Sequence, residues 1–172
     1  MTLAQAARNI ERTVGAARRI RFCSRCGTLD AGRDRRPPAP GRERVCTDCG
    51  MGILLSCSRE ALVTAGASFL IVTDDLRVSA VSQTAERMFA PEIEMLGSQL
   101  LRWMSSPLGA DELAAGVTRT ARGSREVVSL PVMIANHRSR RWGSLEARIA
   151  MCGPPQAALV VVGSVSPMRL DG

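Results

Sequence analysis

The sequence has a single histidine, His137, no lysine and no tyrosine, so all 23 of its basic residues are arginine. One imidazole excludes mechanisms that need two, such as that of a HExxH zinc protease, and any Ser–His–Asp arrangement would have to use His137. The absence of lysine excludes a P-loop lysine and a Schiff-base lysine. Aromatic residues make up only 3% of the chain. The core must therefore be aliphatic, and an aromatic platform for stacking bases is not expected.

Long apolar runs are also missing. The longest, residues 69–72 and 157–162, are far too short to cross a bilayer, and residues 1–20 contain no apolar block of signal-peptide length. We therefore expect a soluble, cytoplasmic protein with no membrane partner. In a reducing compartment, paired cysteines favour metal binding over disulfide formation. A chain of 172 residues that is 45% hydrophobic can form one packed domain with a small appendage.

The charge is unevenly distributed. Residues 1–59 contain 12 of the 23 basic residues and five of the 16 acidic residues, so they carry the whole net charge of +7. Such an asymmetry indicates an anionic partner for the N-terminal third. Five arginines between the two cysteine pairs described below are the candidate contacts to nucleic acid or to another partner, with a solvated loop as the alternative. They are Arg33, Arg35, Arg36, Arg42 and Arg44.

Four cysteines have the spacing C-x2-C-x19-C-x2-C. They are Cys23, Cys26, Cys46 and Cys49. Two thiolates three positions apart converge in a tight turn, and Gly27 and Gly50 follow the pairs where that turn needs a positive φ. Two such turns predict a tetrahedral all-sulfur site, which suits a structural Zn²⁺ ion and leaves no position for water. A redox-switch dithiol and an iron–sulfur site are the alternatives.

The sequence VCTDCG at residues 45–50 resembles the second knuckle of the zinc ribbon and zinc finger family. This resemblance covers about 30 residues and implies a metal site more than it implies a function. Outside it, we expect Cys57 to be a buried thiol and Cys152 to lie in a hairpin loop before Gly153.

Three segments follow from the pattern. In residues 1–21, apolar side chains recur at steps of four and three, which predicts an amphipathic helix that either docks on its own domain or forms a coiled-coil seam. Residues 22–57, where helical periodicity stops, form the four-cysteine module. Residues 62–167 form a separate domain, read as two strands, three helical stretches and three strands.

Residues 67–78 (ASFLIVTDDLRV) and 81–89 (VSQTAERMF) resemble the opening hairpin and the following helix of PAS domains. The resemblance implies an α+β fold, with a five-stranded antiparallel sheet in the order 2-1-5-4-3 and helices on one face. The first and last strands would then be central. They are the two continuous apolar runs, as expected for strands covered on both faces. Pro131 falls in the third strand, which would be an edge.

The resemblance to PAS domains implies a sensor or interaction domain that forms homodimers through the sheet and the N-terminal helix. The small-molecule ligand is not identified, because His137 lies in a polar loop and residues 82–122 contain no cysteine for a photoactive flavin. We expect a non-enzymatic regulator that acts through a macromolecular partner. The alternatives are a nucleic-acid-binding transcriptional regulator that uses the basic module, and a thiol or zinc redox sensor.

Overall fold

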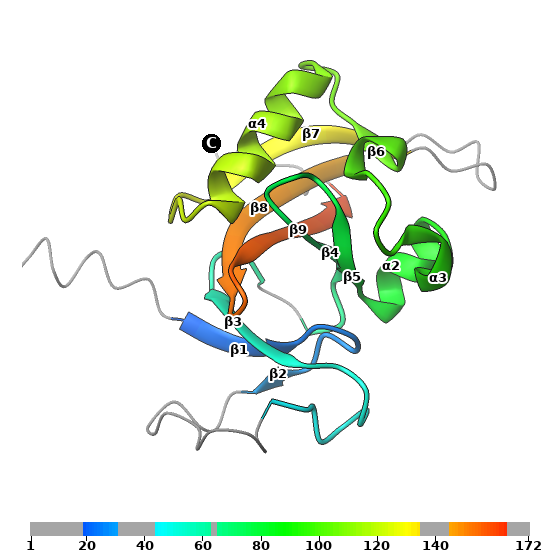
Figure 1. Ribbon diagram of the computed structural model, residues 1–172, viewed down its shortest axis with the longest axis vertical. Coiled ribbons are helices and arrows are strands. Elements are labelled where there is room, and N and C mark those ends of the chain that lie inside the picture. Colours follow the sequence, from blue (N-terminus) through cyan, green and yellow to red (C-terminus); the bar gives the residue numbers. More distant parts are fainter. Residues whose placement is uncertain (1–18, 31–43, 63–64, 135–144, 165–172) are drawn as a thin grey trace, which may run out of the picture.

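The computed structural model describes residues 19–30, 44–62, 65–134 and 145–164. They form one curled antiparallel sheet, with its helices packed on one face (Figure 1). The strands are β1 (Arg19–Cys23), β2 (Leu29–Asp30), β3 (Leu54–Ser58), β4 (Ser68–Val72), β5 (Val78–Val81), β6 (Met104–Ser105), β7 (Val128–Ile134), β8 (Leu145–Gly153) and β9 (Ala157–Ser164). The helices are α2 (Gln83–Met88), α3 (Glu92–Met95), the 3-10 helix η1 (Leu100–Arg102) and α4 (Ala110–Ala121).

Five strands have the predicted order. Strands β5, β4, β9, β8 and β7 are neighbours in that sequence, which corresponds to 2-1-5-4-3 for the five strands expected from the sequence. Strands β4 and β9 are central, and β4 is buried at all five positions. On β7, Pro131 pairs with Glu146 of β8, while β6 covers only the far end of β7. The prediction that Pro131 lies in an edge strand is therefore confirmed for its half of β7.

The prediction of exactly five strands is wrong, because β1, β2, β3 and β6 extend the sheet. Strand β8 has β9 along one edge, and β7 and β3 share its other edge. The junction with β3 consists of two pairs, Ser56 with Gly153 and Cys57 with Cys152. In Figure 1, β1, β2 and β3 lie at the lower end of the sheet. The four-cysteine segment is thus continuous with the sheet that follows it.

The predicted N-terminal helix is wrong over residues 19–21, which belong to β1 and pair with β3. Residues 1–18 of that prediction lie outside the described residues. Burial in β1 increases from Arg19, which is exposed, to Phe22 and Cys23, which are buried. Phe22 meets Phe69 of β4 edge to face, with ring centroids 5.4 Å apart. This contact favours a strand at residues where periodicity alone had favoured the end of a helix.

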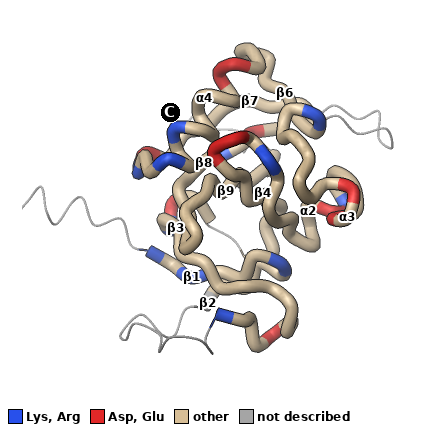
Figure 2. The backbone as a smooth tube through the Cα atoms, in the orientation of Figure 1, with Lys and Arg blue, Asp and Glu red and all other residues tan. Residues whose placement is uncertain are grey.

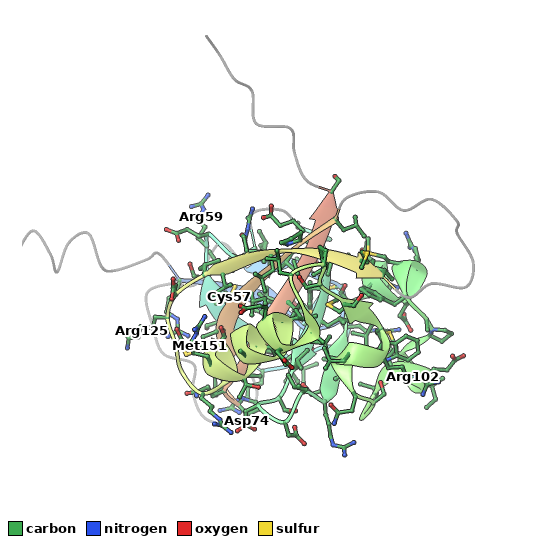
Figure 3. All side chains as sticks on the ribbon, turned by 90° about the horizontal axis from the view of Figure 1, so that it is seen from above. Cys57, Arg59, Asp74, Arg102, Arg125 and Met151 are labelled. Carbon is green, nitrogen blue, oxygen red and sulfur yellow. The ribbon has the colours of Figure 1, made fainter. Side chains whose placement is uncertain are left out.

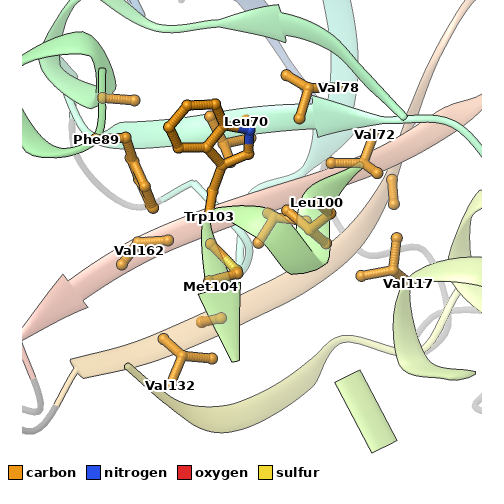
Figure 4. Close-up of a cluster of buried hydrophobic side chains, with 14 of the residues drawn as sticks. Leu70, Val72, Val78, Phe89, Leu100, Trp103, Met104, Val117, Val132 and Val162 are labelled. Carbon is orange, nitrogen blue, oxygen red and sulfur yellow. The ribbon is translucent and has the colours of Figure 1, made fainter. Parts of the chain in front are cut away.

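Each face of the sheet carries its own core. In β9, Val160 and Val162 face the helices, whereas Ala157 and Leu159 face β1 and β3. The core on the helix side is mostly aliphatic and also contains Trp103 and Phe89 (Figure 4). The core on the other face includes Phe22, Leu55, Cys57, Leu62, Phe69, Ile71, Cys152 and Leu159. The four-cysteine segment therefore covers part of the sheet face that the helices leave open.

Helix α2 begins where the sequence predicts. Ser82 is its N-cap: the hydroxyl accepts hydrogen bonds from the N–H of Ala85 at 3.2 Å and of Phe69 at 2.9 Å, and it donates to the Ala67 carbonyl at 3.2 Å. Ser82 thereby fixes the start of α2 to β4. Among the helices of the described segments, none combines the length and the apolar character that a membrane span requires.

Candidate metal centre

The two cysteine pairs form two copies of the same turn. The Gly27 N–H donates to the Cys23 carbonyl at 3.1 Å, and the Gly50 N–H donates to the Cys46 carbonyl at 2.9 Å. The φ angles of Gly27 and Gly50 are 71° and 67°, so the predicted positive values are confirmed. Glycine adopts this conformation without the steric cost that a Cβ brings. Each turn brings its two cysteine side chains to the same side.

The structure brings the four predicted cysteines together. Their sulfur atoms all lie within 4.8 Å of one another, with Cys23 Sγ 3.6 Å from Cys49 Sγ and Cys26 Sγ 3.8 Å from Cys46 Sγ. Zinc–sulfur bonds of about 2.3 Å in a tetrahedron place the sulfurs about 3.8 Å apart. A disulfide would bring two of them to about 2.05 Å, and all four are free thiols. The donor set therefore fits one tetrahedral metal ion.

Backbone N–H groups point at two of the sulfurs. Cys23 Sγ accepts from the Arg25 N–H at 3.3 Å and from the Cys26 N–H at 3.5 Å, while Cys49 Sγ accepts from the Gly52 N–H at 3.4 Å. The N–H groups of Met51 and Gly52 lower the pKa of Cys49 to about 6, because they stabilise its thiolate. Burial raises the pKa of Cys23 to about 12. A bound metal cation would offset the cost of burying a negative charge on the Cys23 sulfur.

Gly52 is a site residue that the sequence analysis missed. Its carbonyl accepts from the Cys46 N–H at 2.8 Å, and a Cβ at this position would lie 2.2 Å from Cys23 Sγ and 2.8 Å from Arg25 Cβ. The next residue joins the two turns, since the Ser24 N–H donates to the Ile53 carbonyl at 2.8 Å and the Ile53 N–H donates to Ser24 Oγ at 3.1 Å. Only glycine leaves room for the Cys23 sulfur between the two turns.

Arg25 is a second residue that the sequence analysis missed, and it lies between two of the cysteines. Its guanidinium contacts Glu86 Oε2 at 3.0 Å and Glu92 Oε2 at 2.8 Å, and its carbonyl accepts from the Gln83 N–H at 2.8 Å. Figure 2 marks the acidic residues on α2 and α3. The sequence places these partners about 60 residues away, and nothing in the cysteine spacing indicates them.

The predicted basic contact surface lies mostly outside the described residues. The described residues leave out four of the five predicted arginines, and they also leave out His137. The four are Arg33, Arg35, Arg36 and Arg42. Arg44 is described and exposed, and its carbonyl accepts from the Leu54 N–H at 2.6 Å. Its side chain is therefore on the surface of the four-cysteine segment, next to the second turn.

The other two cysteines form a buried cross-strand pair. The prediction of a buried thiol is confirmed for Cys57, which is fully buried at the junction of β3 and β8 (Figure 3). The prediction of a loop position for Cys152 is wrong: it lies in β8, opposite Cys57, and is 1% exposed. The Gly-Pro-Pro sequence that follows had favoured an earlier end to the strand. Burial raises the pKa of each thiol to about 12.

An open pocket of about 290 Å³ lies elsewhere, on the sheet face beside residues 61 and 67. Glu146 and Arg148 supply its charged groups among small and apolar residues. Arg148 already donates to the Glu60 carbonyl at 3.0 Å and lies 3.9 Å from Glu146. These polar groups are engaged within the chain, and the pocket contains none of the four cysteines.

No protein-family model matches the chain, and no curated protein sequence matches it. Among solved structures, the crystal structure of the PAS domain of nitrogen regulation protein NR(II) from Vibrio parahaemolyticus is similar, with a TM-score of 0.45 and 16% sequence identity. The match covers 58% of this chain and 89% of that one. Within this chain, the PAS-like feature is the strand order β5-β4-β9-β8-β7.

Proposed function

We propose that this chain is a non-enzymatic regulatory protein, in which a PAS-like sensor or interaction domain is joined to a structural zinc module and acts through a macromolecular partner. The observation that carries the proposal is the closed cluster of four cysteine sulfurs, built onto the same sheet as the PAS-like strands. Four protein ligands leave no coordination position for water or substrate. The geometry thus supports a stabilising metal rather than a catalytic one.

Zinc is the metal we propose. Thiolates are soft ligands, and a tetrahedral set of four is typical of structural zinc. Sulfur separations of 3.6 Å and 3.8 Å suit a single ion. An iron–sulfur cluster would need room for several metal and sulfide ions between the same cysteines. Cys23, Cys26, Cys46 and Cys49 would hold the ion, whose chemistry here is to neutralise and fasten the two turns.

The metal module and the PAS-like domain are proposed to fold as one unit. The sequence divided the chain into residues 1–21, 22–57 and 62–167, yet β3 pairs with β8, and Phe22 of β1 packs against Phe69 of β4. A shared core of this kind makes separate folding of the module unfavourable. We retain the proposal of a homodimer through the PAS-like domain and the N-terminal segment.

Native mass spectrometry of the untagged full-length protein tests the metal and the assembly together. The expected result is one zinc ion per chain in a particle of two chains. Protein that folds with no metal would contradict the zinc module, and a monomer at micromolar concentration would contradict the homodimer. A matched Cys46→Ser, Cys49→Ser variant should bind no zinc and should have a lower thermal midpoint.

The regulatory role needs its own test. At physiological salt, the wild-type protein should bind a macromolecular partner in pull-down assays, or a small molecule in thermal-shift assays. The zinc-free variant should lose the macromolecular interaction if the module takes part in it. Failure of the wild-type protein to bind any ligand of either class would remove the support for this role.

Nucleic-acid binding is a second candidate, favoured by the net charge of residues 1–59 and by the exposed side chain of Arg44. Affinity for duplex DNA and for RNA should fall steeply with salt if arginines contact phosphates, and a flat dependence of log K on log salt would eliminate it. The third candidate, a thiol redox sensor, requires mild peroxide to release zinc. Retention of the metal under those conditions would exclude it.

A further inference from the structure

Arg25 connects the candidate metal centre directly to α2 and α3. It is one of the two residues between Cys23 and Cys26, so its backbone belongs to the first cysteine turn. Its side chain leaves the turn and bridges Glu86 of α2 and Glu92 of α3. The side chains of Arg25, Glu86 and Glu92 are 20%, 23% and 32% exposed, so these ion pairs are partly shielded from water.

Backbone contacts reinforce the same connection. The carbonyl of Arg25 accepts a hydrogen bond from the N–H of Gln83, the first residue of α2, at 2.8 Å. Inside the helical pair, Glu86 Oε1 accepts from the Glu92 N–H at 2.8 Å. Glu86 therefore contacts Arg25 through one carboxylate oxygen and the Glu92 backbone through the other. The cysteine turn, α2 and α3 form one network of polar contacts.

The two helices are short enough to depend on this network. Helix α2 has six residues and α3 has four. Isolated helices of fewer than about 12 residues are marginal in water, because nucleation is costly and few bonds follow it. Each helix contributes one buried residue, Ala85 on α2 and Met95 on α3, and Met88 and Phe89 pack beside them against the helix-side core. Arg25 adds polar contacts to both helices, beside the Ser82 cap of α2 and these apolar contacts.

We propose that metal occupancy of the four-cysteine site is transmitted through Arg25 to the position of α2 and α3. This inference rests on the proposed function, because it requires a metal at Cys23, Cys26, Cys46 and Cys49. With the ion bound, the first turn is fixed and presents the Arg25 carbonyl and guanidinium to both helices. Without it, the thiols no longer link the two turns, and the position of Arg25 relative to both helices is less firmly fixed.

Thermodynamic linkage makes the effect reciprocal. If the metal stabilises the docked helices, the docked helices must raise metal affinity by the same factor, and couplings of this kind are typically about 5- to 150-fold. The side chain at position 25 needs two separate donor groups, because the two terminal nitrogens of the guanidinium contact different carboxylates. Lysine offers a single point charge and can hold only one of them at a time. Arg25→Lys should therefore retain part of the coupling that Arg25→Ala removes.

The experiment compares hydrogen exchange of the full-length protein with and without metal, in the wild type, Arg25→Ala and Arg25→Lys. In the wild type, we expect metal removal to speed exchange in residues 83–95 by at least about 5-fold, with a smaller change in α4, which serves as the internal reference. Arg25→Ala removes the ion pairs but keeps the backbone hydrogen bond to the Gln83 N–H, so metal removal should change exchange in these residues less than it does in the wild type. The cobalt affinity of Arg25→Ala should fall by the same factor as its exchange response. Arg25→Lys should lie between the wild type and Arg25→Ala in both measurements.

Cobalt spectra separate failure of this inference from failure of the proposed function. A wild-type protein without the spectrum of tetrahedral thiolate coordination would refute the metal site itself. A normal cobalt spectrum, together with equal exchange rates in residues 83–95 with and without metal, would refute the coupling and leave the metal site standing. Arg122→Ala is the matched control, because Arg122 pairs with Asp74 at 3.4 Å in an exposed ion pair and should not change either measurement.

A second variant keeps the test decisive if Arg25→Ala does not fold. Glu86→Gln with Glu92→Gln leaves every residue of the metal turns intact and keeps an oxygen to accept the Glu92 backbone N–H. It should bind cobalt with the wild-type spectrum, yet exchange in residues 83–95 should respond to metal less than it does in the wild type. A response equal to that of the wild type would overturn the role of the Arg25 ion pairs.

Discussion

Substitution of Gly52 by alanine is the sharpest steric test of the metal centre. The added Cβ would lie 2.2 Å from Cys23 Sγ, whereas ordinary contact begins near 3.4 Å, so the sulfur must move by at least 1.2 Å. The Cβ would also lie 2.8 Å from Arg25 Cβ and 2.9 Å from the Arg25 backbone nitrogen. A shift of the Cβ toward Arg25 therefore cannot relieve the clash with the sulfur. Metal–ligand distances tolerate deviations of only about 0.2 Å. The substitution should therefore remove Cys23 from the coordination set.

We expect Gly52→Ala to lower zinc affinity by more than about 100-fold, since even loss of a residue that supports a ligand costs about 10- to 100-fold. Chelator competition measures the affinity, and the cobalt spectrum reports whether four thiolates still coordinate the ion. Thermal midpoints with and without metal should converge, because metal that no longer binds cannot stabilise the fold.

Gly50→Ala is the matched control, two residues away. Gly50 has a positive φ of 67°, but a Cβ there meets nothing within 4 Å. This variant should lose about 1–2 kcal/mol of stability through backbone strain and should still bind zinc with four sulfurs. The reasoning would be refuted if Gly52→Ala bound zinc as tightly as the wild type, or if the two variants lost affinity equally.

Three further predictions concern the sheet and its cores. Ser82→Ala removes the cap of α2 and a hydrogen bond to Phe69, so we expect a loss of about 2–3 kcal/mol in denaturant unfolding, and an unchanged free energy would contradict it. The buried hydroxyl of Thr120 has no hydrogen-bond partner among the described residues. Thr120→Val should therefore raise the free energy of unfolding by about 1 kcal/mol and raise the thermal midpoint with it. A lower midpoint would count against the packing described. The thiols of Cys57 and Cys152 have pKa values near 12 against an ordinary 9.0, so the unfolded chain releases their protons first and stability must fall as pH rises from 9 to 12. The slope is about 1.4 kcal/mol per pH unit for each thiol, and a double alanine variant should show a shallower slope in urea titrations at fixed metal concentration. Equal slopes would refute it.

The sequence was most informative where the structure depends on neighbours along the chain. The two cysteine turns follow from local geometry: three-residue spacing brings two sulfurs together, and Gly27 and Gly50 supply the positive φ. Continuous apolar runs identified β4 and β9 as central, because a strand covered on both faces has no polar side.

Features that depend on distant partners were not predictable. The β-strands at residues 19–23 and 54–58 pair with each other across an insertion, and their cysteines, serines and arginines obscure any alternating pattern. Cys152 pairs with Ala157 of β9 on one side and with Cys57 of β3 on the other, and the second partner is about 95 residues earlier in the chain. Gly52 and Arg25 have no local signature, since one is needed for a sulfur that lies 29 residues earlier and the other for carboxylates on α2 and α3.

X-ray absorption at the zinc edge, on full-length protein as purified, tests the central claim most directly. The account predicts four sulfur neighbours at about 2.3 Å from the metal and no oxygen or nitrogen neighbours. A first shell that contains oxygen or nitrogen, or folded protein that carries no zinc, would contradict it.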